Sequence, residues 1–219
     1  MKAVVVAHGE VDPADAAHAR SADLVIAADG GSGHLEAWGI APHLVVGDLD
    51  SLPPEARSRF AGQRVERHPA EKDKTDTELA VDRAIAAGAD EVIVLGALGG
   101  PRVDHALANT LLLALDRGGE TRVRLVRGPI SMRVIRGGER AALGGALGEL
   151  VTLLSVGGDA GGVRTEGLRY PLRSETLRLG SSRGVSNEIA SRGASVTLGS
   201  GILLVVEGGR LSPAPEAEA

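Results

Sequence analysis

Short apolar runs alternate with helical stretches along the first 126 residues of the chain. The runs are rich in β-branched residues and lie at Ala3–Ala7, Leu24–Ala28, Leu44–Gly47, Arg64–His68, Glu91–Leu95 and Arg122–Val126. The helical stretches between them are Gly33–Trp38, Pro54–Phe60, Thr75–Ala87 and Asp104–Arg117. Apolar strands separated by helices predict a parallel sheet that is buried on both faces. Residues 1–126 are therefore expected to form a Rossmann-like α/β domain.

The pattern changes near residue 127, where the helical period disappears. Shorter runs follow, separated by glycine-rich breaks, at Met132–Arg136, Leu150–Val156, Gly162–Thr165, Leu177–Leu179, Ser195–Leu198 and Ile202–Val206. This spacing predicts an antiparallel β-sandwich over residues 127–211. Residues 212–219 are rich in Pro, Ala and Glu and are expected to be a disordered tail.

Composition excludes several classes of function. The 219 residues carry a net charge of −5, and their only aromatic residues are Trp38, Phe60 and Tyr170, so nucleic acid is not expected as a partner. The chain has no cysteine, which removes disulfides, cysteine-bound zinc and thiol catalysis. No apolar run reaches the length of a membrane span, and the amino terminus lacks a signal-peptide pattern. We therefore expect a cytoplasmic protein without a membrane partner.

Four polar clusters lie where predicted strands end or a helix begins. Residues 29–31 and 47–51 follow the second and third strands, residues 96–105 follow the fifth, and residues 72–76 open the helix after the fourth. Ligands of open parallel sheets bind outside the carboxyl ends of the strands. The four clusters are therefore predicted to form one site.

Asp48 and Asp50 are the first candidate metal ligands. They are two residues apart, so an extended segment points both carboxylates the same way. Close carboxylates repel unless a proton or a cation neutralises them, and oxygen ligands that leave room for phosphates suit Mg²⁺. The alternative is a Gly-Asp turn in which Asp50 and Ser51 cap the next helix.

Asp73 and Asp76 extend this acidic group. They are three residues apart and share one face if a helix begins there. Thr75 starts a capping-box pattern, which offers a purely structural explanation for the cluster. Lys72 and Lys74 either meet phosphate oxygens as point charges or are solvated.

Two glycine pairs, Gly30-Gly31 and Gly99-Gly100, each follow a strand and precede a helix. Glycine there lets backbone N–H groups approach a phosphate, although such a pair is more often a simple turn. The chain has neither a dinucleotide fingerprint nor a Walker A loop. Arg102 offers a bidentate phosphate contact. Asp104 either orients Arg102 or caps the following helix, and capping is the favoured role.

Together, the ordered motifs resemble those of bacterial thiamine pyrophosphokinases (thiamine diphosphokinases). The motifs are DGG at 29–31, GDLDS at 47–51, KDKTD at 72–76, GGPRVDH at 99–105 and the pair Ser186-Asn187. They span nearly the whole chain. Leu49 stands where the family commonly has Phe, and Pro101 interrupts the usual Gly-Gly-Arg. The resemblance implies an α/β ATP-binding catalytic domain, a β-sandwich substrate and dimerisation domain, and a homodimer with a shared active site.

The implied reaction transfers the diphosphate group of ATP to the hydroxyl of thiamine, giving thiamine diphosphate and AMP. It is implied to depend on Mg²⁺ and to proceed by in-line attack on the β-phosphorus. By resemblance, the catalytic residues are Asp48, Asp50, Asp73 and Asp76, of which the first three bind the metal. The residues expected around ATP are Asp29, Gly30, Gly31, Lys72, Thr75, Gly99, Gly100, Arg102, Asp104 and His105. Ser186 and Asn187 are expected to contact thiamine.

Two other functions remain open. A diphosphokinase for another small alcohol, such as a hydroxymethylpterin, would use the same acidic rim, but a pterin pocket needs stacking surface that this chain scarcely has. A non-catalytic sensor of nucleotide or thiamine is the second alternative. The acidic residues disfavour it, because a sensor has no need for a full set of metal-binding carboxylates.

Overall fold

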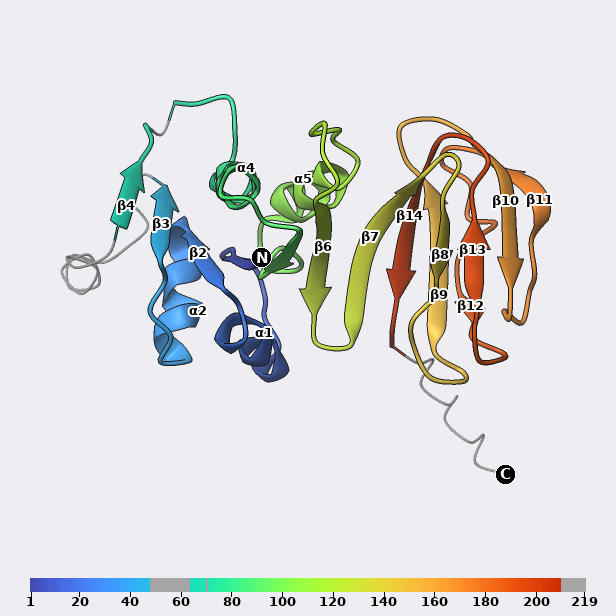
Figure 1. The fold of residues 1–219 in the computed structure, drawn as a ribbon, viewed down its shortest axis with the longest axis horizontal. Helices are drawn as coiled ribbons and strands as arrows, with labels where there is room; N and C mark the ends of the chain where they lie inside the picture. Colours follow the sequence, from blue (N-terminus) through green and yellow to red (C-terminus); the bar gives the residue numbers. More distant parts are fainter. Residues whose placement is uncertain (48–63, 70, 210–219) are drawn as a thin grey trace. The chain divides into compact units, whose positions relative to one another are not determined.

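The structure is a computed structural model that describes residues 1–47, 64–69 and 71–209. The chain divides between Gly128 and Pro129 into two compact units, whose elements are labelled in Figure 1. The helix predicted over Pro54–Phe60 lies outside the described residues.

Parallel strands form the sheet of the first unit, in the order β6-β5-β1-β2-β3-β4. They are β1 (Lys2–Val6), β2 (Leu24–Ala28), β3 (Leu44–Gly47), β4 (Arg64–Arg67), β5 (Glu91–Leu95) and β6 (Arg122–Arg127). In the centre, Val4 of β1 is paired with Val25 of β2 and Ile93 of β5. All three side chains are buried, as expected for a parallel sheet covered on both faces.

Helices cover the two faces of this sheet. Ala19 and Leu35 pack in one cluster with Val4 and Val6 of β1. Right-handed crossovers put helices on opposite faces when the chain moves in opposite directions across the sheet. The chain moves from β1 outward to β4 and returns to β5 and β6, so α4 and α5 cover the other face. The helices are η1 (Pro13–Asp15), α1 (Ala16–Arg20), η2 (Asp29–Gly31), α2 (Ser32–Ala37), α4 (Asp76–Ala86) and α5 (Val103–Leu112).

Antiparallel strands build the second unit in two layers. One layer has the order β12-β9-β14-β7 and contains β7 (Ile130–Arg136), β9 (Leu150–Ser155), β12 (Asn187–Glu188) and β14 (Ile202–Glu207). The other has the order β11-β10-β13-β8 and contains β8 (Arg140–Ala142), β10 (Ala160–Glu166), β11 (Arg173–Leu177) and β13 (Ser195–Thr197). Leu153 and Leu203 of the first layer share a core cluster with Val163 and Val196 of the second. The predicted β-sandwich is therefore present.

Among the described residues, two predicted elements have a boundary that differs from the structure by more than two residues. The strand predicted at Leu177–Leu179 is wrong, because β11 spans Arg173–Leu177 and Leu179 is 59% exposed. This strand lies at a sheet edge with polar residues along most of its length, so its apolar pattern is weak. The helix predicted over Asp104–Arg117 ends earlier, at Leu112. Its four-residue leucine stripe faces away from the sheet, since Leu107 is 61% exposed whereas Asn109 is buried.

Candidate active site

A pocket of about 410 Å³ opens in the first unit at the carboxyl ends of β1, β2 and β5. The amino-terminal ends of α4 and α5 complete its wall. Three of the four polar clusters singled out from the sequence contribute to it. The fourth, residues 47–51, lies outside the described residues beyond Gly47. The lining residues are Ala7, His8, Gly9, Ala28, Asp29, Thr75, Asp76, Thr77, Gly96, Ala97, Gly99, Gly100, Pro101, Arg102, His105, Ala106 and Asn109.

The pocket therefore gathers about half of the residues predicted for the site. Those that line it are Asp29, Thr75, Asp76, Gly99, Gly100, Arg102 and His105. Gly30, Gly31, Lys72, Asp73 and Asp104 are described but do not line it. Asp48 and Asp50 lie outside the described residues, and Ser186 and Asn187 belong to the second unit.

Asp29 occupies a tight corner at the end of β2. Its φ is +44°, in the left-handed region that Asp tolerates better than most residues. A Cβ added to Gly47, at the end of β3, would lie 3.0 Å from the Asp29 Cβ. Glycine at 47 therefore lets the chain pass close beside Asp29 as it enters the acidic segment 48–50.

Gly30 packs against the side chain of His8. A Cβ at Gly30 would lie 2.4 Å from Nδ1 of His8, a pocket-lining side chain. The space that a side chain would occupy there is filled by the imidazole. The close approach that the sequence analysis assigned to a phosphate is, at this glycine, made by His8.

The second glycine pair, Gly99-Gly100, forms a turn that is hydrogen-bonded to the carboxylate of Glu10. Gly99 and Gly100 have φ values of +73° and +83°, which side-chain-bearing residues rarely adopt. Oε1 of Glu10 accepts a hydrogen bond from the Gly100 N–H at 3.1 Å, and its other carboxylate oxygen pairs with Arg127. The Gly100 N–H, which the sequence offers to a phosphate, is thus bound by Glu10 in this structure.

Arg102 and Asp104 form a two-point ion pair at the mouth of the pocket. Nε and Nη2 of Arg102 donate to the two oxygens of Asp104 at 2.9 and 2.7 Å. The hydrogen bond from Arg102 holds the pKa of Asp104 well below its usual range. The favoured prediction that Asp104 caps α5 is wrong, because the N-cap position is Arg102, which makes no side-chain cap bond. Asp104 instead orients Arg102, the other role that the sequence allowed.

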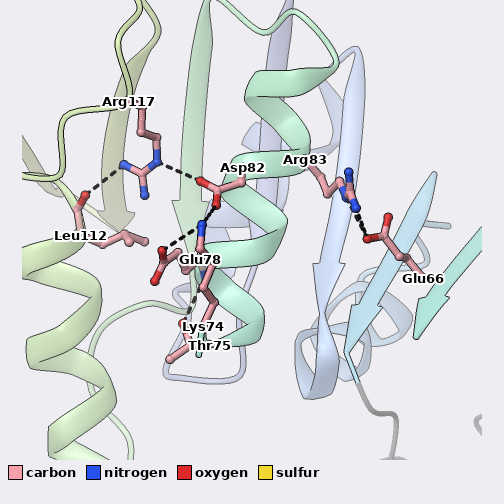
Figure 2. Close-up of polar contacts among 8 residues, drawn as sticks. All are labelled: Glu66, Lys74, Thr75, Glu78, Asp82, Arg83, Leu112 and Arg117. Carbon is pink, nitrogen blue, oxygen red and sulfur yellow. Dashed lines mark hydrogen bonds and ion pairs between the residues drawn. The ribbon is translucent and has the colours of Figure 1, made fainter. Parts of the chain in front are cut away.

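The segment before α4 is fixed to the first turn of the helix by two side-chain contacts. Thr75 is the N-cap, and its Oγ1 accepts a hydrogen bond from the Glu78 N–H at 3.2 Å, as the capping pattern predicts (Figure 2). Nζ of Lys72 pairs with Oδ1 of Asp76 at 2.8 Å. Because α4 begins at Asp76, Asp73 precedes the helix, so the condition under which Asp73 and Asp76 would share its first turn is not met.

Sequence reasoning missed His8 and Asn109. Both line the pocket, His8 from the loop after β1 and Asn109 from α5. Asn109 is buried, and its Nδ2 donates to the Ala97 carbonyl at 3.0 Å, which fixes the loop after β5 against the helix. For Asn109, the available signal was a polar residue within the apolar stretch from Leu107 to Leu113.

Family models match both units of the chain. Residues 16–124 match the thiamin pyrophosphokinase catalytic domain, and residues 140–203 match the thiamin pyrophosphokinase vitamin B1 binding domain. The chain belongs to the thiamine pyrophosphokinase family. The resemblance inferred from the sequence motifs is confirmed, and so is the prediction that the chain is an enzyme.

Individual thiamine pyrophosphokinases are similar along most of their length. The enzyme of Bacillus subtilis is 29% identical over 185 residues, covering 84% of this chain and 86% of that protein. Its crystal structure matches with a TM-score of 0.84 at 27% identity, covering 96% of this chain and all of that one. The structure from Geobacillus thermodenitrificans matches with a TM-score of 0.82 at 26% identity, covering 98% and 100%. These likenesses confirm the α/β domain followed by a β-sandwich.

In the part matched by the vitamin B1 binding domain, Asn187 is engaged by neighbouring backbone. Its Oδ1 accepts hydrogen bonds from the N–H groups of Tyr170 and Glu188, and its Nδ2 donates to the Tyr170 carbonyl at 2.7 Å. Ser186 has a φ of +58°, and its N–H donates to Oγ1 of Thr152 at 3.1 Å. Contact of Ser186 and Asn187 with thiamine stays a prediction.

The described residues of this chain contain no group of three or more Asp, Glu, His or Cys side chains that could hold a metal ion. The two carboxylates predicted to do so from segment 48–50 lie outside those residues. Across residues 1–47, 64–69 and 71–209, no helix has the length and apolar character needed to cross a membrane.

Proposed function

We propose that this chain transfers the diphosphate group of ATP to the hydroxyl of thiamine, forming thiamine diphosphate and AMP. The observation that carries the proposal is the match of two thiamine pyrophosphokinase domains, in order, along one chain. The catalytic-domain match includes β2, β5, α4 and α5, which frame the pocket, while β1 precedes the matched residues. In this proposal the α/β domain, residues 1–126, binds ATP, and the sandwich, residues 127–211, contributes to the thiamine site and to dimerisation.

The pocket is suited to a polyanion in three respects. The amino-terminal ends of α4 and α5 both line it, and backbone N–H groups at helix amino termini favour phosphate. The glycine turn Gly99-Gly100 lines the pocket without side chains that would keep a phosphate at a distance, and Glu10 holds the turn through the Gly100 N–H. Arg102 adds a guanidinium at the mouth, held in place by Asp104. We assign these groups to the phosphates of ATP.

Mg²⁺ fits the donor chemistry of this site. Asp29 and Asp76 are the carboxylates that line the described pocket, and oxygen donors are what Mg²⁺ takes. Asp48 and Asp50 follow Gly47, which lies beside Asp29. We propose that Asp48, Asp50 and Asp73 hold the ion, with Asp76 in the same acidic group. When bound, Mg²⁺ supplies neutralisation of charge on the phosphate oxygens.

Transfer of a diphosphate requires positioning more than covalent help from the protein. The thiamine oxygen forms a bond to the β-phosphorus of ATP, and the bond from that phosphorus to the oxygen bridging to AMP breaks in line with it. The hydroxyl proton is released, and one of the aspartates is suited to accept it. The remaining pocket residues hold the two substrates in this alignment.

We further propose that the enzyme is a homodimer. An exposed apolar stripe on α5 supports this proposal: Val103, Leu107 and Leu111 are 67%, 61% and 59% exposed. Contiguous exposed apolar side chains commonly mark protein interfaces. Light scattering at assay concentrations tests it, and a monomer that retains full activity would contradict it.

The decisive experiment supplies purified protein with ATP, Mg²⁺ and thiamine and measures AMP and thiamine diphosphate. We expect equal amounts of both, no product with EDTA, and recovery when Mg²⁺ is restored. Asp48→Asn and Asp73→Asn should abolish turnover while the protein remains folded. If AMP is released only with a hydroxymethylpterin, that alcohol and not thiamine is the acceptor. ATP binding without turnover on any acceptor would favour the sensor.

A further inference from the structure

Asp82, in the middle of α4, joins two segments that are distant in the sequence (Figure 2). Its Oδ2 accepts a hydrogen bond from Nζ of Lys74 at 2.7 Å. Its Oδ1 accepts one from Nε of Arg117 at 3.0 Å. Nη1 of Arg117 continues the chain of contacts by donating to the Leu112 carbonyl at 3.1 Å. One carboxylate thus connects the entry to α4 with the carboxyl-terminal end of α5.

Both ends of this connection belong to segments that line the pocket. Lys74 directly precedes Thr75, the N-cap of α4, which lines the pocket. Leu112 is the last residue of α5, and the same helix lines the pocket with His105 and Asn109. A shift of either helix along its axis would therefore change the separation of two pocket walls.

The connection between the two helices is partly buried and charge-assisted. Arg117 has a side chain that is only 14% exposed, whereas Lys74 is 46% exposed. Burial raises the pKa of the Asp82 carboxyl, but the hydrogen bonds from Lys74 and Arg117 outweigh it and lower the pKa overall. The carboxylate is consequently ionised at neutral pH. Charge-assisted hydrogen bonds to such a group are roughly twice as strong as neutral ones.

We propose that Asp82 is a positioning residue for the nucleotide pocket: through Lys74 and Arg117 it fixes the distance between the amino-terminal ends of α4 and α5. The proposal rests on the proposed function, because it assigns these two walls to ATP. It also gives Lys74 a role that the sequence analysis left open between phosphate contact and solvation. Lys74 holds the segment that precedes the helix, and its ammonium group pairs with Asp82 and with Glu78.

The test compares Asp82→Asn with Arg83→Gln, a matched control on the same helix. Arg83 pairs with Glu66 of β4, with Nε 2.8 Å from the carboxylate, and so connects α4 to the sheet edge (Figure 2). We expect Asp82→Asn to raise the KM for ATP about tenfold while the KM for thiamine changes less than about twofold. Arg83→Gln should leave both constants within about twofold of wild type. Asp82→Glu keeps the charge, so its KM for ATP should stay much closer to that of wild type than the KM of Asp82→Asn.

Binding of ATP by calorimetry, measured alongside turnover, separates this proposal from the proposed function. If wild type binds ATP but transfers no diphosphate, the proposed function fails, and the change in ATP affinity of Asp82→Asn still decides the positioning role. If Asp82→Asn and Arg83→Gln lower the melting temperature equally and have the same KM for ATP, the proposal is overturned. An equal rise in the KM values of both substrates overturns it as well. Should Asp82→Asn not fold, Arg117→Lys, which loses the contact to Leu112, should raise the KM for ATP about threefold.

Discussion

The backbone of Gly31 lies directly against the carbonyl of Val6, so that a Cβ on Gly31 would be only 1.9 Å from the Val6 oxygen. Val6 ends β1, and Gly31 precedes α2. No side chain can be accommodated at this distance unless the strand and the helix separate. The glycine is therefore fixed by packing between β1 and α2, whatever its relation to a phosphate.

Gly31→Ala is expected to destabilise the protein by about 3 kcal/mol or more, because the methyl group meets backbone that cannot move aside. Gly33→Ala is the matched control: Gly33 lies within α2, and a Cβ there has no atom within 4 Å. It should be neutral or stabilising by up to about 0.5 kcal/mol. Chemical denaturation of both variants checks the prediction. Equal free energies of unfolding for the two would contradict it.

Glu10→Ala should loosen the turn at Gly99 and Gly100. The variant loses the acceptor of the Gly100 N–H and the partner of Arg127. Because the Glu10 side chain is 51% exposed, we expect a loss of only about 1 kcal/mol in the free energy of unfolding. Amide hydrogen exchange should show faster exchange at Gly100. Unchanged exchange there would mean that Glu10 does not hold the turn.

Asn109→Leu should weaken the link between α5 and the loop after β5. The substitution leaves the buried Ala97 carbonyl without the Asn109 donor, at a cost of about 1–3 kcal/mol. Thr110→Ala is the control, because the Thr110 hydroxyl donates within its own helix, to the Ala106 carbonyl at 2.9 Å. Thermal unfolding should separate the two variants clearly. A larger loss for Thr110→Ala would contradict the assignment.

The ion pair between Glu66 and Arg83 should give a defined pH dependence. Burial raises the pKa of Glu66, but hydrogen bonds from Arg83 and His68 outweigh it, so the pKa lies below its ordinary value of 4.5. A carboxyl group whose pKa is lower in the folded state adds stability above its unfolded pKa and loses it as pH falls through the folded value. Glu66→Gln should therefore destabilise the protein by up to about 1 kcal/mol near neutral pH.

The difference in stability between wild type and Glu66→Gln should shrink as the pH falls below about 4.5. Melting curves from neutral to acid pH measure it. Arg83→Gln serves as the reciprocal variant and should lose its effect over the same range. A difference that stays constant down to acid pH would show that the Glu66 charge does not act through Arg83.

Local pattern predicted the strands of the first unit well. β2, β3 and β5 have the predicted bounds, because each is a short apolar run buried on both sides. The helix α1 was not predicted, since its five residues are too few to show a period. β8 and β12 were missed for the same reason, having three and two residues.

The sequence predicted where the residues of the candidate site lie better than it predicted which of them contact one another. The sequence placed Asp29, Thr75 and Arg102 at one rim because strand ends of a parallel sheet converge, and all three line the pocket. It did not predict that Glu10 binds Gly100, because the two residues are 90 positions apart. Nor did it predict the bond between Asp82 and Arg117, which spans 35 positions.

The sequence by itself therefore determined the order of the two folds, the helix and strand positions with strong apolar periods, and the family. These follow from local spacing, which backbone geometry turns into secondary structure and motifs. The tertiary structure alone decided which charges pair across distant segments. Arg127 pairs with Glu10, Arg117 with Asp82, and Arg83 with Glu66. The members of each pair lie far apart along the chain, and only the packing of strands, helices and loops brings them within reach of each other.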